Sequence, residues 1–273
     1  MNAILFYVTP SFRLTGSVLN AMEYFIEANS HNKDVKLVLV NGTPNFKKNI
    51  TQIAKERYDL GLFRGIGIGM DIINVRKANL VVHKFDTVLV LDFMTINQTK
   101  GLINAEKILV ISEKHTADPE YFYSKDLYNV EYYGEMPWHY RDHEYRMKML
   151  FDRYKPLKNV EEATYINSPH NDMLNIELLK KYDLPTPYLF KSKTNHRENL
   201  FEKFTHYVYY HADKWFDPHP RLMLECAFYE KKLHYINPID RQDGSWYRWR
   251  DLQENGLKDR TLSKDDEIIG QLI

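Results

Sequence analysis

Two acidic residues and an arginine lie close together in the segment FDPHPRLMLECAFYEKKLHYIN, residues 216–237. Glu225 stands inside an apolar run with helical spacing, Asp217 precedes it, and Arg221 lies one helical turn before it. A carboxylate in apolar surroundings costs free energy unless a partner or a ligand satisfies it. Two interpretations are open. Glu225 pairs with Arg221 on one helix face, or it binds the hydroxyl groups of a ribose whose phosphates sit at the helix start.

The spacing of the two acids resembles the nucleotide-sugar site of the two-lobed (GT-B) glycosyltransferases. In that family Glu, seven residues and a second Glu are followed by Ala and by Gly-x-Pro before a strand. By this resemblance Glu225 would hold the donor ribose, Asp217 would lie near the donor sugar, and Arg221 would lie near the diphosphate. Glu230 and Lys232 stand where the family has Gly and Pro, so the loop into the following strand must differ.

The elements that must position these residues follow from the alternation of apolar runs and helical patterns. Strands are expected at residues 3–9, 35–42, 86–93, 107–112, 163–169, 187–192, 206–212 and 233–238. Helices are expected at residues 17–30, 50–63, 99–107, 142–155, 171–184, 197–204 and 216–230, and residues 64–77 are expected to form a turn or bulge. This alternation predicts an α/β protein with parallel sheets.

The loosened, tyrosine-rich pattern near residues 113–135 is interpreted as the junction of two halves. We therefore predict two Rossmann-like lobes that face a central cleft, the GT-B arrangement. Residues 1–117 would form the acceptor-side lobe and residues 118–273 the nucleotide-sugar lobe.

Further candidates are the residues that directly follow a predicted strand, because open α/β sheets bind ligands at the carboxyl ends of their strands. Asp92 ends TVLVLD and is the predicted general base of an inverting transferase. Glu113 and His115 are alternatives for this role, Asp92 could equally cap a turn, and a retaining enzyme would need no such base.

Donor contacts are also predicted for three residues outside residues 216–237, which we call the acidic segment. Gly16, after the first strand, allows close approach of the backbone to a ligand, although an ordinary helix start at this position is an equally good interpretation. Lys191 and Lys193 follow PYLF and could reach a diphosphate.

No Asp-x-Asp occurs in the chain, so we expect no metal and no cofactor beyond the nucleotide-sugar.

Composition sets the remaining expectations. Lys plus Arg and Asp plus Glu both number 37, so the net charge is zero and no global field attracts polyanions. The single cysteine, Cys226, and the absence of a long apolar run indicate a cytoplasmic protein without a membrane partner.

The chain, rich in Lys, Asn, Tyr and Ile, also resembles proteins of T-even-type phages, which include glucosyl- and arabinosyltransferases that modify 5-hydroxymethylcytosine in DNA. That likeness implies a UDP-linked donor, hydroxymethylated double-stranded DNA as acceptor and a location in the host cytoplasm. A surface glycan or small-molecule acceptor, or a nucleotide- or DNA-binding protein without catalysis, remains the alternative.

Overall fold

The computed structural model describes residues 1–9, 16–58, 71–91, 93–111, 129–132, 156–167, 177, 179–186, 188–190, 200–210, 221–236 and 264–273. The internal contacts divide the chain into two compact units. The first unit contains residues 1–146 together with 261–273, and the second contains residues 147–260. Both units contain a parallel sheet, so the predicted α/β class is confirmed.

The first unit is built on a six-stranded parallel sheet in the order β3-β2-β1-β4-β5-β6. Its strands are β1 (Ala3–Tyr7), β2 (Lys36–Val40), β3 (Ile72–Val75), β4 (Lys84–Leu91), β5 (Asn104–Ile111) and β6 (Asn129–Tyr132). Its helices are α1 (Gly16–His31), α2 (Pro44–Arg57), the 3-10 helix η2 (Lys77–Val82), α4 (Phe93–Thr99) and α10 (Lys264–Leu272). The strand order reverses between β1 and β4, as in dinucleotide-binding sheets.

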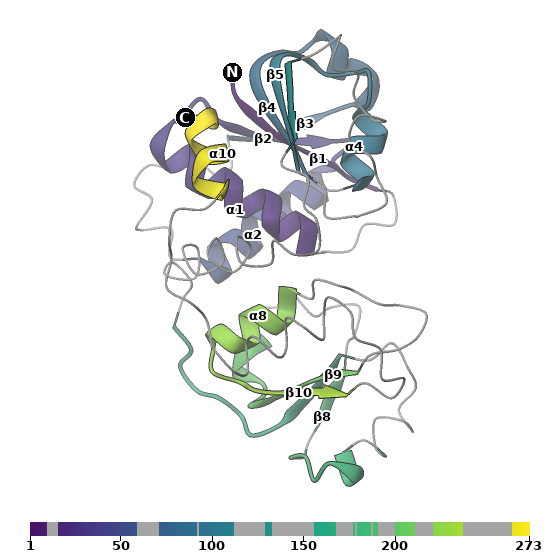
Figure 1. Ribbon diagram of the computed structural model, residues 1–273, viewed down its shortest axis with the longest axis vertical. Coiled ribbons are helices and arrows are strands. Elements are labelled where there is room, and N and C mark those ends of the chain that lie inside the picture. The colour runs from purple at the N-terminus through teal and green to yellow at the C-terminus, as the bar shows by residue number, and fades with distance from the viewer. Residues whose placement is uncertain are drawn as a thin grey trace. The chain divides into compact units, whose positions relative to one another are not determined.

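Aliphatic side chains fill both faces of this sheet. Ala3 and Leu5 of β1 pack in one cluster with Ile96 of α4, and Ile4 and Phe6, which point to the opposite face, are buried as well. Figure 1 shows α4 on one side of the sheet, with α1 and α10 on the other. Burial on two faces explains why the strands read as continuous apolar runs in the sequence.

The C-terminal helix α10 belongs to the first unit, where it packs against α1 and β4 (Figure 1). The Asn2 side chain joins these elements, because its amide donates to the Leu272 carbonyl at 2.9 Å and its oxygen accepts from the Thr87 N–H at 3.0 Å. The expected assignment of residues 118–273 to one lobe is corrected at two segments. Both β6 and α10 lie in the first unit, since strand pairing and apolar burial place them there.

The second unit is built on a four-stranded parallel sheet in the order β10-β9-β7-β8. Its elements are β7 (Thr164–Asn167), β8 (Tyr188–Phe190), the 3-10 helix η3 (Leu200–Glu202), β9 (His206–Tyr210), α8 (Arg221–Phe228) and β10 (Lys232–Ile236).

The core of the second unit combines an aliphatic cluster, which includes Ile166 and Val208, with packed aromatic rings. The Tyr165 ring lies 5.1 Å from that of Phe204 and 6.0 Å from that of Tyr207, between ring centroids, and Phe201 lies 4.7 Å from Tyr229. Short strands bury few residues each, and large rings compensate because each one covers a large apolar area. Core packing thus accounts for part of the 20 tyrosines and 14 phenylalanines of the chain.

The predicted strands coincide with observed strands in both units, whereas several predicted helices are shifted or shorter. The predicted helix at 99–107 is wrong: α4 ends at Thr99, Gly101 adopts a φ of 70°, and β5 begins at Asn104. The predicted turn at 64–77 contains β3, and η3 occupies only three residues of the expected helix at 197–204. The expected helix at 142–155 lies outside the described residues.

Within the described ranges, every helix is too short or too polar to cross a lipid bilayer.

Candidate functional site

Each sheet has one point where the strand order reverses, and open parallel sheets bind ligands outside the carboxyl ends of the strands at such points. In the first sheet this point lies between β1 and β4, and in the second it lies between β7 and β9. The carboxyl ends next to these points are Tyr7 and Leu91 in the first unit, and Asn167 and Tyr210 in the second. The two edges are the places where a ligand site is expected.

In the second unit, α8 is the next described element after β9. The chain therefore leaves the sheet beside its reversal point and passes through residues 211–220 before Arg221 opens the helix. The acidic segment recognised in the sequence thus connects to the expected edge of the sheet. This connection follows from strand order and does not depend on any side-chain position.

Glu225 is 1% exposed, so its carboxylate is enclosed by protein. The neighbouring Cys226 is also buried, and the pKa of its thiol is raised well above its usual range, first by burial and then by the negative charge of Glu225. A thiol with a raised pKa is a poor nucleophile. The predicted contact between Glu225 and a ribose requires the carboxylate to become accessible to a ligand.

The structure does not bring the remaining predicted residues together in one described site. Asp92, Asp217, Lys191 and Lys193 lie outside the described residues. Gly16 is the first residue of α1 in the first unit, the helix-start position that its sequence context suggested. Arg221 is the first residue of α8 in the second unit.

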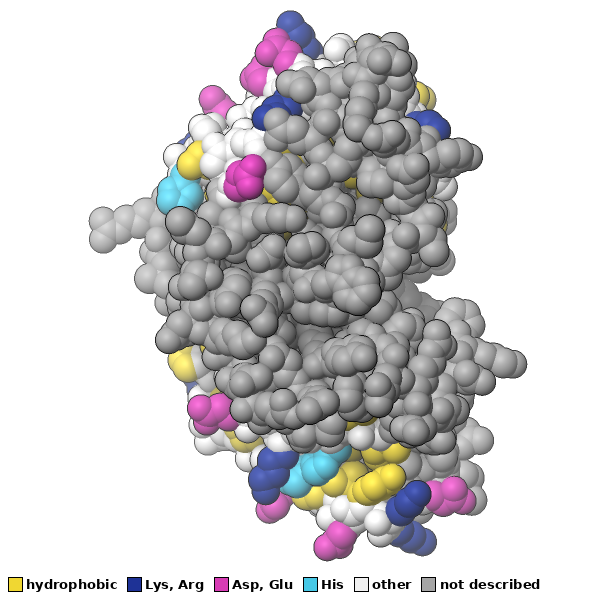
Figure 2. All heavy atoms as spheres, viewed as in Figure 1, with side chains coloured by type: hydrophobic (Ala, Val, Ile, Leu, Met, Phe, Trp, Pro, Cys, Tyr) yellow, Lys and Arg dark blue, Asp and Glu magenta, His cyan; other side chains and the backbone are white. Residues whose placement is uncertain are grey.

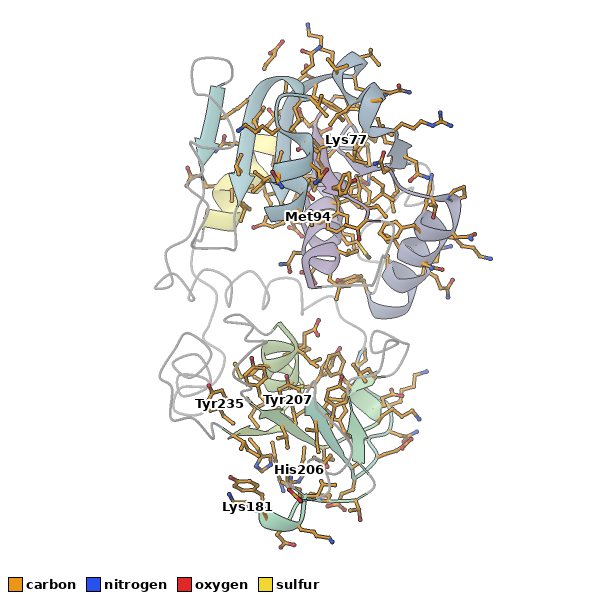
Figure 3. The ribbon with its side chains drawn as sticks, turned by 90° about the vertical axis from the view of Figure 1, so that its right-hand side faces the viewer. Lys77, Met94, Lys181, His206, Tyr207 and Tyr235 are labelled. Carbon is orange, nitrogen blue, oxygen red and sulfur yellow. The ribbon has the colours of Figure 1, made fainter. Side chains whose placement is uncertain are left out.

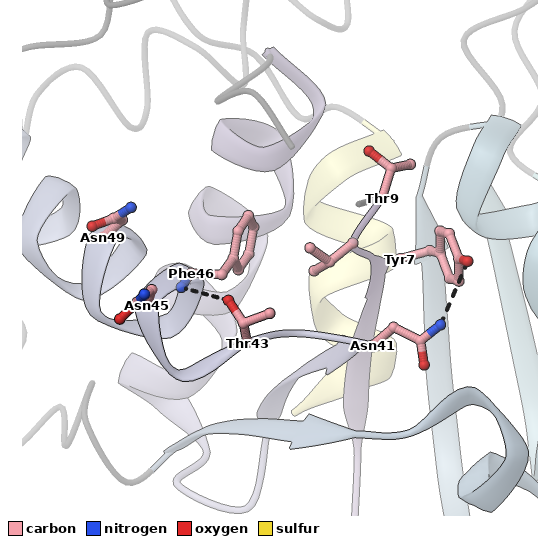
Figure 4. A pocket seen from close by; sticks show the side chains of 8 residues that line it. Tyr7, Thr9, Asn41, Thr43, Asn45, Phe46 and Asn49 are labelled. Carbon is pink, nitrogen blue, oxygen red and sulfur yellow. Dashed lines mark hydrogen bonds between the residues drawn. The ribbon is translucent and has the colours of Figure 1, made fainter. Parts of the chain in front are cut away.

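A pocket of about 350 Å³ lies at the carboxyl edge of the first sheet, and none of the residues that line it was among the predicted site residues. Its walls come from the end of β1, the turn between β2 and α2, and the first turns of α2 (Figure 4). Val8 and Phe46 are buried and form an apolar part of the wall, while Asn45 and Asn49 are exposed. This volume falls within the range of small-molecule sites.

The turn between β2 and α2 fixes the shape of this pocket. Asn41 has a φ of 60°, a left-handed conformation that asparagine tolerates better than most residues. A side chain at Gly42 would collide with Asn74 and Leu39. Thr43 then caps α2, because its Oγ1 accepts from the Phe46 N–H at 3.1 Å.

Hydrogen bonds of Asn41 connect the ends of three strands. Its main-chain N–H donates to the Val75 carbonyl of β3 at 2.7 Å, and its side-chain oxygen accepts from the Lys77 N–H at 2.7 Å. Its side-chain Nδ2 points toward the Tyr7 hydroxyl of β1, 3.5 Å away (Figure 4). The carboxamide oxygen therefore accepts from Lys77, and the carboxamide nitrogen is directed at Tyr7 (Figure 4).

Further polar groups lie along the same edge. The Tyr7 N–H donates to Oγ1 of Thr95 at 2.9 Å, which joins β1 to α4 across the reversal point. Lys77 Nζ donates to Gln98 Oε1 at 3.0 Å. The Gln98 Nε2 in turn lies 3.9 Å from the sulfur of the exposed Met94 (Figure 3 labels Lys77 and Met94). The sequence signal for this edge was the run NGTPN at residues 41–45, which combines a turn, a helix cap and a first-turn proline.

A pair of histidines, His206 and His234, lies on the face of the second sheet opposite to Tyr207, and His206 is at the amino end of β9. His206 Nδ1 and His234 Nε2 are 3.0 Å apart, and the two rings lie within 9° of parallel with centroids 5.2 Å apart. Figure 3 shows His206 on the opposite side of the sheet from Tyr207 and α8. Burial lowers the pKa of both imidazoles, and the charge of Lys232 lowers both further.

No cluster of three or more His, Cys, Asp or Glu side chains with the geometry of a metal site occurs in the described part of the chain.

Compared with protein-family models, with curated proteins and with solved structures, the chain shows no significant match.

Proposed function

We propose that the protein is a metal-independent glycosyltransferase of the GT-B type, which moves a sugar from a nucleotide-sugar, UDP-linked in our expectation, to a hydroxyl acceptor. In this proposal the second unit binds the donor, the first unit binds the acceptor, and the two units face a common cleft. The observation that carries the proposal is the order of the second sheet, which reverses beside β9, the strand that precedes α8. A donor site at that reversal point agrees with the general behaviour of open parallel sheets.

The donor would be held by residues of the acidic segment. Arg221 and the main-chain N–H groups at the start of α8 would balance the negative charge of the leaving diphosphate. Glu225 would accept hydrogen bonds from the ribose hydroxyls, and Asp217 would lie near the sugar. Lys191 and Lys193, which follow β8, would supply further positive charge.

The acceptor chemistry would be carried by the first unit. Asp92 directly follows β4 and would remove the proton of the acceptor hydroxyl if the enzyme inverts the anomeric centre. Gly16 at the start of α1 would allow the substrate to approach the backbone.

We propose 5-hydroxymethylcytosine in phage DNA as the acceptor, with a surface glycan or a small molecule as the alternative. The charge distribution gives DNA no general attraction, since the net charge is zero and the described Lys, Arg, Asp and Glu side chains are interspersed on the face in Figure 2. Binding of DNA would then depend on base contacts more than on neutralised phosphates.

The test mixes the full-length protein with UDP-, GDP-, ADP- and CMP-linked sugars, with and without hydroxymethylated duplex DNA. Nucleotide release and the mass of the DNA bases are measured. Transfer predicts nucleotide release that rises when the acceptor is present, together with a sugar mass on hydroxymethylcytosine. Absence of release and of binding for every donor would overturn the proposal.

Two variants of the same helix region test the role of Glu225. Glu225→Gln keeps the shape and removes the negative charge, so donor binding should weaken if the carboxylate contacts ribose hydroxyls. Glu230→Gln is the matched control, because Glu230 is exposed just after α8. Equal donor affinity in the two variants would remove Glu225 from the site and leave it a structural residue.

A nucleotide-binding protein without transfer is the second candidate, favoured by the strand order of the first sheet, which is that of dinucleotide-binding proteins. It predicts saturable nucleotide binding with no release of sugar under any acceptor condition. The donor assay separates the two functions, because binding and turnover are read out independently.

A further inference from the structure

We infer that the pocket at the carboxyl ends of β1 and β2 is a binding site for an uncharged nucleobase. The inference concerns the first unit alone, and it does not depend on Glu225 or on sugar transfer. Only the identification of this base as the acceptor rests on the proposed function. Three features of the pocket carry the inference: its size and apolar wall, its carboxamide groups, and its poor fit to anions.

The size and wall of the pocket suit a flat ring. A volume of about 350 Å³ exceeds what one or two waters require. Val8 and Phe46 are buried and contribute apolar surface, and Thr9 and Thr43 contribute methyl groups beside them (Figure 4). A base presents two apolar faces, which such a wall can cover, and it concentrates its polar atoms at its edge.

The polar groups suit the edge of a base. A carboxamide offers two donors and an acceptor in one plane, which is why asparagine can pair with a base through two hydrogen bonds. Asn41, Asn45 and Asn49 all line the pocket. The Lys77 N–H donates to the oxygen of Asn41, whose Nδ2 lies 3.5 Å from the Tyr7 hydroxyl, and Thr43 Oγ1 accepts from the Phe46 N–H. Asn45 and Asn49 supply side-chain carboxamides that can both donate to and accept from the edge of a base.

The start of α2 is poorly suited to a phosphate. Pro44 has no N–H, and the N–H of Phe46 is already bound to Thr43, so only Asn45 keeps a free amide among the first three helical residues. The described residues that line the pocket include no lysine, arginine or histidine. The pocket is therefore matched to the uncharged part of a nucleotide.

The experiment titrates the full chain with adenosine, guanosine, cytidine, uridine and 5-hydroxymethylcytidine, none of which carries a phosphate. Binding is followed by saturation-transfer NMR and isothermal titration calorimetry. Inorganic phosphate and glucose are added as competitors. We expect at least one nucleoside to bind saturably and neither competitor to displace it. Failure of all five nucleosides, or displacement by phosphate or glucose, overturns the inference.

Variants locate the bound nucleoside in the first unit. The Asn45→Ala, Asn49→Ala double variant should weaken binding roughly fivefold to a hundredfold, the range expected for losing a pair of base-edge hydrogen bonds. Asn79→Ala is the matched control, because Asn79 is an exposed asparagine of the same unit outside the pocket. Unchanged affinity in the double variant, or an equal loss in the control, also overturns the inference.

The two proposals fail separately. Glu225→Gln reports on the second unit, to which Glu225 belongs, whereas the Asn45→Ala, Asn49→Ala double variant reports on the first. If no donor sugar is released while a nucleoside still binds through Asn45 and Asn49, only the proposed transfer falls. If donors react while no nucleoside binds to the first unit, only the base pocket falls.

Discussion

Both units bury a glutamate within an apolar helix, Glu23 in α1 of the first unit and Glu225 in α8 of the second. Glu23 of α1 is fully buried, and the Tyr58 hydroxyl at the end of α2 donates to its Oε1 at 2.8 Å. Glu225 of α8 is equally buried and raises the pKa of Cys226 through its charge. Glu23 is thus bonded within its own unit, so an acid buried in an apolar helix is not by itself a sign of a ligand.

The two units also differ in how their cores are packed. The first unit covers α1 with the sheet and with α10, so residues 18–29 of this helix are all buried. The second unit has a smaller sheet, whose core combines aliphatic side chains with aromatic rings. In the first unit the buried Glu23 accepts a hydrogen bond from Tyr58 of the same unit.

The largest effect is expected from truncating the buried side chains of α10, the helix that packs against α1. Ile268 and Leu272 of α10 are 1% and 0% exposed, and replacing each buried aliphatic side chain by alanine costs about 2 to 5 kcal/mol. The Ile268→Ala, Leu272→Ala double variant should lose about 4 to 10 kcal/mol of the first unit's stability. Hydrogen exchange followed by mass spectrometry should show faster exchange in α1 and β4, with β7 and β9 unchanged.

Gly270→Ala is the control for that experiment. Gly270 lies on the same helix, and a methyl group added there meets no atom within 4 Å. Alanine is the better helix former, so this variant should retain or slightly increase protection of α1. Faster exchange in β9 of the double variant would show that the two units share one cooperative core.

A smaller effect is expected from removing the partner of Glu23. Tyr58→Phe deletes one hydroxyl and leaves a buried carboxylate oxygen without that donor, which should cost about 1 to 3 kcal/mol. Denaturant unfolding measures the loss, and Glu23→Gln combined with Tyr58→Phe shows how much of it comes from the negative charge. If Tyr58→Phe has no effect on stability, the hydrogen bond from Tyr58 is not what keeps Glu23 buried.

The helix cap at the pocket is expected to contribute about 1 kcal/mol. Thr43→Ala removes the acceptor of the Phe46 N–H at the start of α2 and should lower stability by about 0.5 to 2 kcal/mol. Thr43→Ser retains the hydroxyl and should restore most of the loss. Thermal unfolding of both variants measures this, and equal stability of Ala and Ser would mean that the turn is held by Asn41 and Gly42 alone.

The strands could be predicted from the sequence because buried parallel strands are continuous apolar runs, as AILFYVT and KLVLV are. The boundary between the units could not be predicted in the same way. It depends on where β6 pairs and where α10 packs, and both are contacts between residues far apart in the chain. The tyrosine-rich pattern near residue 117 indicated a loosened segment and carried no information about pairing.

The candidate sites show the same limit. Acid spacing in the sequence identified Glu225, but the bond from Tyr58 to the buried Glu23 shows that an acid in an apolar helix can be satisfied within its own unit. The pocket in the first unit escaped sequence analysis because its residues are neutral and come from two separate segments, residues 7–9 and 41–49. The run NGTPN is typical of a turn and a helix start, although the helix was expected only from residue 50, and the cavity beside this run arises only from the folded sheet edge.

The smallest effect is expected from the histidine pair of the second unit. Burial and Lys232 lower the pKa of His206 and His234 in the folded protein, although Glu162 partly opposes this at His206. The unfolded chain then binds protons more readily, so the stabilising contribution is fully present above the usual histidine pKa of about 6.5 and is lost as the pH falls below it. Hydrogen exchange in β9 and β10, corrected for intrinsic rates, should show less protection at pH 5.5 than at pH 7.5. The His206→Gln, His234→Gln double variant should show a shallower change, while an unchanged slope would mean that acid destabilisation of this unit comes from other groups.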